Sequence, residues 1–310
     1  MAFFSNLVST SQWKKGKTSI IYLILFFDVK NVMLKKILLS TCEPTLTFKS
    51  FISLQLSYNK RKMSTLENVI DGLNDVRCRI KVVAQKQNEG HVEPRLVAVS
   101  KTKPIEHIIG IYQKGQRHFG ENYVQELMTK SSDVEILEKC PDIKWHFIGH
   151  IQKNKVSKVL MTPGLHVIET IDSEKLASAV NDGWKKLNKE SRLKIMVQVN
   201  TSNEKEKSGV TTDTVVDLFK FIIEKCDHLE LIGLMTIGQY GYDCSRGPNP
   251  DFLALVDCKK DVCEKLKLNP SEIELSMGMS DDFEHAIELG STNVRVGSSI
   301  FGFRARKEKQ

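Results

Sequence analysis

The chain has 310 residues, and its 41% hydrophobic and 27% charged content is typical of a globular protein with a sizeable core. Residues 1–62 carry ten Lys or Arg and two acidic residues, whereas residues 63–310 carry 35 basic and 36 acidic residues. The formal net charge of +7 therefore comes from the N-terminal segment, and the rest of the chain is close to neutral. This distribution excludes a broad basic surface, so we expect no nucleic-acid partner.

The N-terminal 62 residues differ from the remainder of the chain. Their longest apolar stretch, Ile20 to Phe27, is far shorter than the roughly 20 residues that cross a bilayer, so we expect no membrane span. Low acidity with many Ser and Thr residues is typical of a mitochondrial transit peptide, although Arg61 is the only arginine. The alternative is a natural start at Met63. In both cases we expect residues 1–62 to be a poorly ordered extension.

The seven cysteines are dispersed, odd in number and free of any CxxC pair. Free thiols in a reducing compartment explain this pattern better than disulfides, so we expect a cytoplasmic protein unless the extension directs it elsewhere. Histidines and cysteines are not clustered at short spacing, and we therefore expect no metal site.

The first regular element is a helix over residues 65–87. Its apolar residues recur at intervals of three and four, and they are Leu66, Val69, Ile70, Leu73, Val76, Ile80, Val83 and Ala84. Ser64 is a candidate N-cap, and Glu67 three residues later would complete a capping box.

Short apolar strands then alternate with amphipathic helices. The predicted strands are 95–100, 117–121, 144–149, 166–171, 194–200, 229–237, 272–277 and 293–297. The predicted helices between them are 104–114, 123–138, 152–160, 173–188, 211–225, 251–266 and 281–289. This alternation predicts an α/β protein with a parallel sheet, and eight strands favour a single closed (β/α)8 barrel of the TIM type over residues 63–310. A doubly wound sheet is the rival, but SKTKP after the first strand lacks its GxGxxG motif.

Lys101 closes the first predicted strand, at the end where barrels place their active sites. A partly desolvated lysine amine can form a Schiff base with an aldehyde cofactor. The alternative for this segment alone is a solvated lysine at the end of a strand. Strand alternation places Lys101 on one face with Val97 and Val99, and Arg295 on the last strand should also face the barrel mouth.

Two segments near the C-terminus predict a phosphate site. SMGMSDD and RVGSSIFG combine glycines with hydroxyls just before helices, and their candidate residues are Ser276, Gly278, Gly297, Ser298 and Ser299. Small residues let backbone N–H groups approach an anion, and barrels commonly hold phosphate after strands seven and eight. Lysine, phosphate loops and arginine together suggest pyridoxal 5′-phosphate (PLP), with the permanently charged Arg295 disfavouring protonation of the pyridine nitrogen.

Other residues carry weaker predictions. Asn122 contacts the cofactor edge or caps the next helix, and Met235 lies near the C-terminal end of the sixth predicted strand. His146 and His150 are acid–base candidates, but we favour satisfied mouth or core histidines. The loop 238–249 is a candidate lid or partner surface.

Several motifs, taken in order, resemble those of the pyridoxal phosphate homeostasis protein family over residues 65–304: AVSKTKP, FGENYVQEL, WHFIGHIQKNK, GLMTIG and LSMGMSDDFEHAIELGSTNVRVGSSIFG. The resemblance implies a barrel similar to the N-terminal domain of alanine racemase, as in fold type III PLP proteins. It also implies a cofactor held covalently on Lys101, with Arg295 at the pyridine nitrogen. Phosphate contacts would come from Ser276, Gly297, Ser298 and Ser299.

The resemblance favours a non-catalytic protein that buffers PLP, takes part in vitamin B6 homeostasis and hands the cofactor to apo PLP-dependent enzymes. We expect no catalytic residue and a monomer or weak dimer. The alternative is a racemase-like PLP enzyme. Racemases of this fold carry a second domain whose tyrosine supplies the opposing acid–base group, whereas FGFRARKEKQ follows the last predicted strand here. A barrel that has lost its ligand is the third possibility.

Overall fold

A computed structural model describes residues 48–86, 93–204 and 206–302, with side chains described from Thr65 onward. The contacts divide the chain into two units, Met1–Lys60 and Arg61–Gln310, and the second unit contains all of the strands. Our expectation for residues 1–47 lies outside the described residues. Within the described part of the chain, no helix has the length and apolar character needed to span a membrane.

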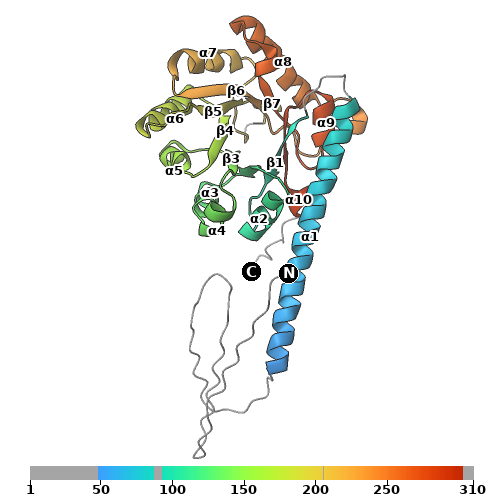
Figure 1. Cartoon of the computed structure of the whole chain (residues 1–310). Helices are drawn as coiled ribbons and strands as arrows, with labels where there is room; N and C mark the ends of the chain where they lie inside the picture. Colours follow the sequence, from blue (N-terminus) through green and yellow to red (C-terminus); the bar gives the residue numbers. More distant parts are fainter. Residues whose placement is uncertain (1–47, 87–92, 205, 303–310) are drawn as a thin grey trace, which may run out of the picture. The chain divides into compact units, whose positions relative to one another are not determined.

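Eight parallel strands form a closed barrel in sequence order (Figure 1). They are β1 Arg95–Val99, β2 His118–Glu121, β3 Lys144–Phe147, β4 Leu165–Ile171, β5 Leu193–Gln198, β6 Leu229–Met235, β7 Glu274–Ser276 and β8 Asn293–Val296. The seam is closed by β1 and β8, which pair over four residues from Arg95 opposite Asn293 to Ala98 opposite Val296. The predicted (β/α)8 fold is confirmed.

Helices surround the strands (Figure 1). They are α1 Phe48–Lys86, α2 Ile105–Gln113, α3 Val124–Ser131, α4 Val134–Lys139, α5 Val156–Leu160, α6 Glu174–Lys186, α7 Val215–Lys225, α8 Pro250–Leu266, α9 Phe283–Glu288 and α10 Ser298–Phe301. Short 3-10 turns are η1 Lys153–Lys155, η2 Cys244–Arg246 and η3 Pro270–Glu272.

Several helix bounds differ from the predictions; α5 begins at Val156 and α7 at Val215, four residues later than predicted. The helix predicted over 123–138 is two helices, because Asp133 accepts a hydrogen bond from the backbone N–H of Glu135 and starts α4 as its N-cap. The N-terminal helix begins at Phe48, so it already includes residues 48–62. Ser64 lies inside this helix, and our prediction that it is the N-cap was wrong.

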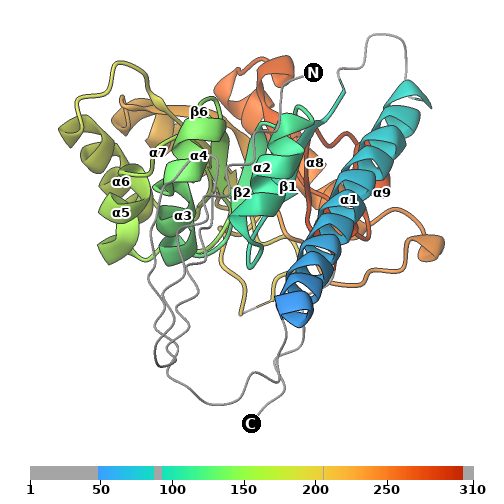
Figure 2. The same ribbon diagram turned by 60° about the horizontal axis from the view of Figure 1, so that its bottom comes forward.

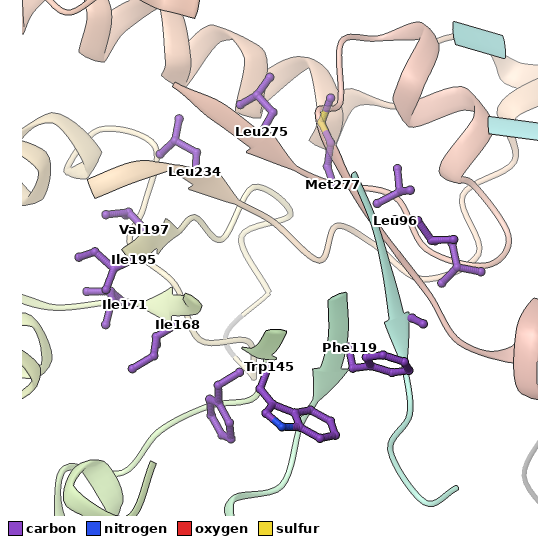
Figure 3. Packing of buried hydrophobic residues seen from close by; sticks show 14 of the residues in the cluster. Leu96, Phe119, Trp145, Ile168, Ile171, Ile195, Val197, Leu234, Leu275 and Met277 are labelled. Atoms are coloured by element: carbon purple, nitrogen blue, oxygen red, sulfur yellow. The ribbon is translucent and has the colours of Figure 1, made fainter. Parts of the chain in front are cut away.

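The main apolar core lies between the strands and the surrounding helices. Outward-facing strand residues such as Phe119, Trp145 and Ile195 belong to one cluster with buried helix residues (Figure 3). In β8, Val294 and Val296 join this cluster, whereas Asn293 and Arg295 point to the other face of the strand.

The inside of the barrel is unusually polar. Ser276 on β7 donates a hydrogen bond to Glu169 on β4, a strand that is not its neighbour, so this contact crosses the barrel interior. Val167, Met196, Ile232 and Met235 form a small apolar cluster that is separate from the main core. Buried polar groups need hydrogen-bond partners, and the strand alternation supplies them from several sides.

The part of α1 from Thr65 onward packs on the barrel. Val69, Leu73 and Val76 are buried in the main core, and Arg79 forms an ion pair with Glu284 of α9 at 2.6 Å. Figure 2 shows α1 running alongside α9. A Cβ atom at Gly72 would lie 2.7 Å from the Ser299 carbonyl oxygen, so α1 approaches α10 as closely as a glycine allows.

Candidate functional site

Lys101 lies in a tight turn directly after β1, and its side chain is half-buried. The next residue, Thr102, has a φ of 63°, a left-handed conformation that β-branched residues rarely adopt. The Thr102 N–H donates a hydrogen bond to the carboxylate of Glu126. Strain of this kind persists where the surrounding structure holds it, and it is concentrated at functional sites.

The buried Lys130 stabilises this turn through three hydrogen bonds. Its Nζ donates to the Ser100 carbonyl oxygen at 2.7 Å, to Glu121 Oε1 at 2.8 Å and to Glu126 Oε1 at 2.7 Å. Ser100 Oγ donates to the same Glu121 oxygen at 2.6 Å. The backbone on both sides of Lys101 is therefore fixed by one network of charged groups from β2 and α3.

Arg295 points into the barrel from β8 and is 4% exposed. Its Nη1 donates to Ser276 Oγ at 2.6 Å, and its Nη2 donates to the Thr236 carbonyl oxygen at 2.7 Å. Burial lowers the pKa of Arg295, while the negative charges of Glu169 and Asp282 oppose this shift. A guanidinium titrates so high that it stays charged, and this site holds a fixed positive charge beneath the mouth.

Glu169 links the residues below Arg295. Its carboxylate accepts from Ser276 at 2.6 Å, from the Asn293 amide at 3.2 Å and from His146 Nδ1 at 2.6 Å. Burial by itself raises the pKa of Glu169, but the His146 hydrogen bond and the Arg295 charge outweigh it, so the net pKa is lowered. The carboxylate is consequently charged beside the arginine.

The loops after β7 and β8 meet at the mouth. The backbone N–H of Gly297 donates to Ser280 Oγ at 3.1 Å, and Ser299 Oγ donates to the Ser280 carbonyl oxygen at 3.3 Å. Gly278 has a φ of 95°, and a Cβ there would lie 2.6 Å from the Ala286 side chain, so both conformation and space require glycine. Ser298 is half-buried like its neighbours at the start of α10.

These loops lie beside the end of β1. A Cβ at Gly297 would be 3.4 Å from the carbonyl oxygen of Val99, two residues before Lys101. The structure therefore places the half-buried lysine and the small-residue loops, which were predicted from separate segments, at one rim of the barrel.

Three predicted site residues have distinct surroundings. Asn122 does not cap α3, whose N-cap is Tyr123, and its buried Oδ1 has no hydrogen-bond partner among the described residues. Met235 is fully buried in the interior cluster, below the mouth. Ser276 is also fully buried, and its hydroxyl is engaged by Arg295, Glu169 and Asn293 rather than turned to the loops.

His146 is a satisfied core histidine, as we favoured. It is fully buried, its Nδ1 bonds Glu169, and its Nε2 lies 2.8 Å from His118 Nδ1. His150 is instead exposed at the carboxyl side of the barrel, where its Nδ1 lies 3.0 Å from Ser208 Oγ.

Sequence reasoning missed several members of this arrangement. Glu169 was visible as an acid inside an apolar strand, and such a residue signals a buried polar partner. His118 and His166 lie at the starts of β2 and β4, and with His146 they bring three imidazoles together. Burial lowers the pKa of His118 to about 2 and that of His166 to about 3, so both rings are neutral at ordinary pH.

The closed barrel and its rim of lysine and small-residue loops define the class of the protein. Residues 59–305 match the family model for the alanine racemase N-terminal domain. An alanine racemase of Clostridium difficile has the same fold, with a TM-score of 0.56 at 14% identity over 77% of this chain and 57% of that chain.

More similar relatives identify the family within this class. The pyridoxal phosphate homeostasis protein of Homo sapiens is 53% identical over 218 residues, which cover 70% of this chain and 79% of the relative. The pyridoxal phosphate homeostasis protein of Caenorhabditis elegans is 47% identical, and the match covers 69% of this chain and 88% of the relative. The structure of PipY from Synechococcus elongatus with PLP bound matches with a TM-score of 0.62 at 28% identity, covering 76% of this chain and all of that one. The chain belongs to the pyridoxal phosphate homeostasis protein family.

Proposed function

We propose that this chain binds PLP as a Schiff base on Lys101 and takes part in intracellular vitamin B6 homeostasis without robust catalytic turnover. The observation that carries the proposal is the position of Lys101, held half-buried by a strained turn at the same rim as the small-residue loops and above a buried arginine. Support also comes from the PLP bound in PipY.

The residues present fit this cofactor. The half-buried stretch Gly297 to Ser299, together with Ser280, offers backbone N–H groups and hydroxyls for a phosphate. The partnerless Asn122 Oδ1 is suited to a hydrogen-bond donor on the bound molecule. When bound, PLP supplies an aldehyde that a lysine amine captures.

We assign Ser276 an indirect part in binding. Its hydroxyl is engaged by the buried groups of Arg295, Glu169 and Asn293, so it orients the arginine. Phosphate contact is then assigned to the half-buried Gly297, Ser298 and Ser299, where an anion would replace the hydrogen bonds that Gly297 and Ser299 make to Ser280. Arg295 then faces the pyridine nitrogen with a fixed positive charge, which keeps that nitrogen unprotonated. This charge would make the bound cofactor a weaker electron sink, in keeping with storage and delivery to apo-enzymes.

Borohydride reduction followed by peptide mass mapping tests the attachment. In the wild-type protein we expect one reduced phosphopyridoxyl group, on Lys101. Lys101→Ala should abolish it, because the nucleophile is removed, whereas Lys153→Ala, at an exposed lysine of η1, should leave it intact. Undiminished covalent capture by Lys101→Ala would refute the assignment.

The alternative function is that of a racemase-like enzyme. It needs a second acid–base group, and His150 is the exposed histidine on the carboxyl side of the barrel, with Asp172 3.5 Å away. A panel of amino acids incubated with the PLP-loaded protein distinguishes the two functions. Turnover above trace rates that disappears in His150→Gln would favour the enzyme.

A further inference from the structure

Three histidines meet at the end of the barrel opposite Lys101. His118 begins β2, His166 is the second residue of β4, and His146 on β3 lies between them. One ring nitrogen from each lies within 4.8 Å of the other two. The closest pair is His118 Nδ1 and His146 Nε2, which are 2.8 Å apart.

The ring positions suit a metal ion. In tetrahedral coordination, nitrogens at about 2.0–2.1 Å from Zn²⁺ lie about 3.3–3.4 Å from one another. The 2.8 Å distance between His118 and His146 would therefore lengthen slightly, and the distances to His166 would adjust toward the same value. His118 and His166 are half-buried, and His118 borders a cavity. His146 is fully buried and supplies the fixed point.

A carboxylate completes the arrangement behind His146. Glu169 Oε1 lies 2.6 Å from His146 Nδ1, which fixes the ring and directs its Nε2 toward His118. A metal-bound histidine almost always donates its other ring N–H to a carboxylate or carbonyl in this way. A hydrogen-bonded histidine pair explains His118 and His146, but it gives no role to the third ring.

Positive charges near the cluster are largely balanced. Arg95 forms a bidentate ion pair with Glu274 at 2.5 and 2.9 Å, and Lys194 lies 4.0 Å from Glu230. Lys144 is exposed. Among the charged groups, the Glu169 carboxylate is the one that directly contacts a ring of the cluster, so its negative charge would favour a divalent cation there.

The cluster borders a cavity at one of its three rings, that of His118. A cavity of about 640 Å³ is lined by His118, together with residues of α1 and the start of β1 that include Arg77, Arg95 and Leu96. His146 and His166 do not line it, so an ion would approach the cluster from the side of His118, and a water molecule there would supply the fourth ligand.

From this geometry we propose that His118, His146 and His166 form a binding site for a borderline-soft divalent transition metal ion, with Zn²⁺ as the expected occupant. His146 binds through Nε2 and His118 through Nδ1, and Glu169 orients His146 from behind. Imidazole ligands favour zinc, copper and nickel over Ca²⁺ and Mg²⁺, which prefer oxygen.

Zinc titration of the chelator-treated full chain against a chromophoric competitor tests the site. We expect one tight, histidine-dependent Zn²⁺ per chain and no comparable binding of Mg²⁺. His118→Gln and His166→Gln should each lower the zinc affinity at least about 10-fold, because even the loss of a residue that only orients a metal ligand has an effect of that size. His228→Gln, on the turn before β6, should bind as the wild type does.

A second measurement separates this site from the cysteines. X-ray absorption of the zinc-loaded wild type should show about three imidazole ligands and no sulfur, whether or not the variants fold well. Sulfur ligands, or unchanged affinity in folded His118→Gln and His166→Gln, would overturn the proposal and assign the bound metal to thiols.

Discussion

Lys130 is the residue on which the geometry around Lys101 most depends. It is 6% exposed and contacts two carboxylates and the carbonyl of Ser100. Removing one member of a buried charge network leaves the others desolvated and unpaired, which costs more than the loss of an exposed ion pair.

We expect Lys130→Met to lower the free energy of unfolding by about 3–5 kcal/mol, because Glu121 and Glu126 lose their buried partner. Capture of PLP should also slow, since the turn that carries Lys101 relaxes. Urea denaturation and stopped-flow absorbance measure the two effects. Lys139→Met is the matched control, because its pair with Glu135 is exposed and solvent-screened, and such pairs contribute little to stability. Equal losses in both variants would contradict this account.

At the scale of elements, the position of α10 depends on α1. A Cβ at Gly72 would meet two backbone carbonyl oxygens, those of Ser299 at 2.7 Å and Ile300 at 2.8 Å. Backbone cannot move aside as a side-chain end can. The part of α1 that packs on the barrel therefore braces the loop that we assign to the phosphate.

We expect Gly72→Ala to cost about 1–3 kcal/mol of stability through overpacking, despite the better helix propensity of alanine. Affinity for PLP should fall as well, because α10 is displaced. Gly183→Ala in α6 is the control, since its new Cβ meets the flexible end of Leu160. Thermal unfolding and PLP titration of the two variants provide the comparison. A Gly72→Ala protein with unchanged PLP affinity would show that α10 does not depend on this contact.

The helices and strands could be predicted from the sequence, but the side-chain contacts between distant strands could not. Alternating strands and helices predicted the barrel, and the glycines and serines around Gly278 and Gly297 predicted the small-residue loops. The network below them could not be predicted, because Glu169 meets Ser276 across the barrel interior, 107 residues away. The three histidines were missed for the same reason, since adjacent strands bring together residues that are far apart in sequence.

On the scale of the whole molecule, one run of hydrogen bonds crosses the barrel. It passes from Arg295 through Ser276, Glu169 and His146 to His118, with each contact between 2.6 and 2.8 Å. It joins Arg295, which lies buried beneath the mouth, to the histidine cluster at the opposite end. Our two proposals therefore concern ends of one connected network.

The barrel should not need the N-terminal extension. Among the described side chains of α1, buried residues begin at Val69, and in a chain that starts at Met63 the side chain of Ser64 becomes available as an N-cap. We expect such a chain to capture PLP and unfold with the same midpoint as the full chain. Circular dichroism melting and PLP absorbance measure both. Loss of folding would show that residues 1–62 belong to the barrel.

The pairing of β1 with β8 has a consequence for encounters with other polypeptides. A ring of eight strands has no unpaired margin, so it offers no template on which a foreign strand could be added. If the proposed transfer of PLP to apo-enzymes takes place, the recipient would then be recognised by side chains on the loops and outer helices. Aggregation by strand exchange, a hazard for open sheets at high cellular concentration, is suppressed by the topology itself.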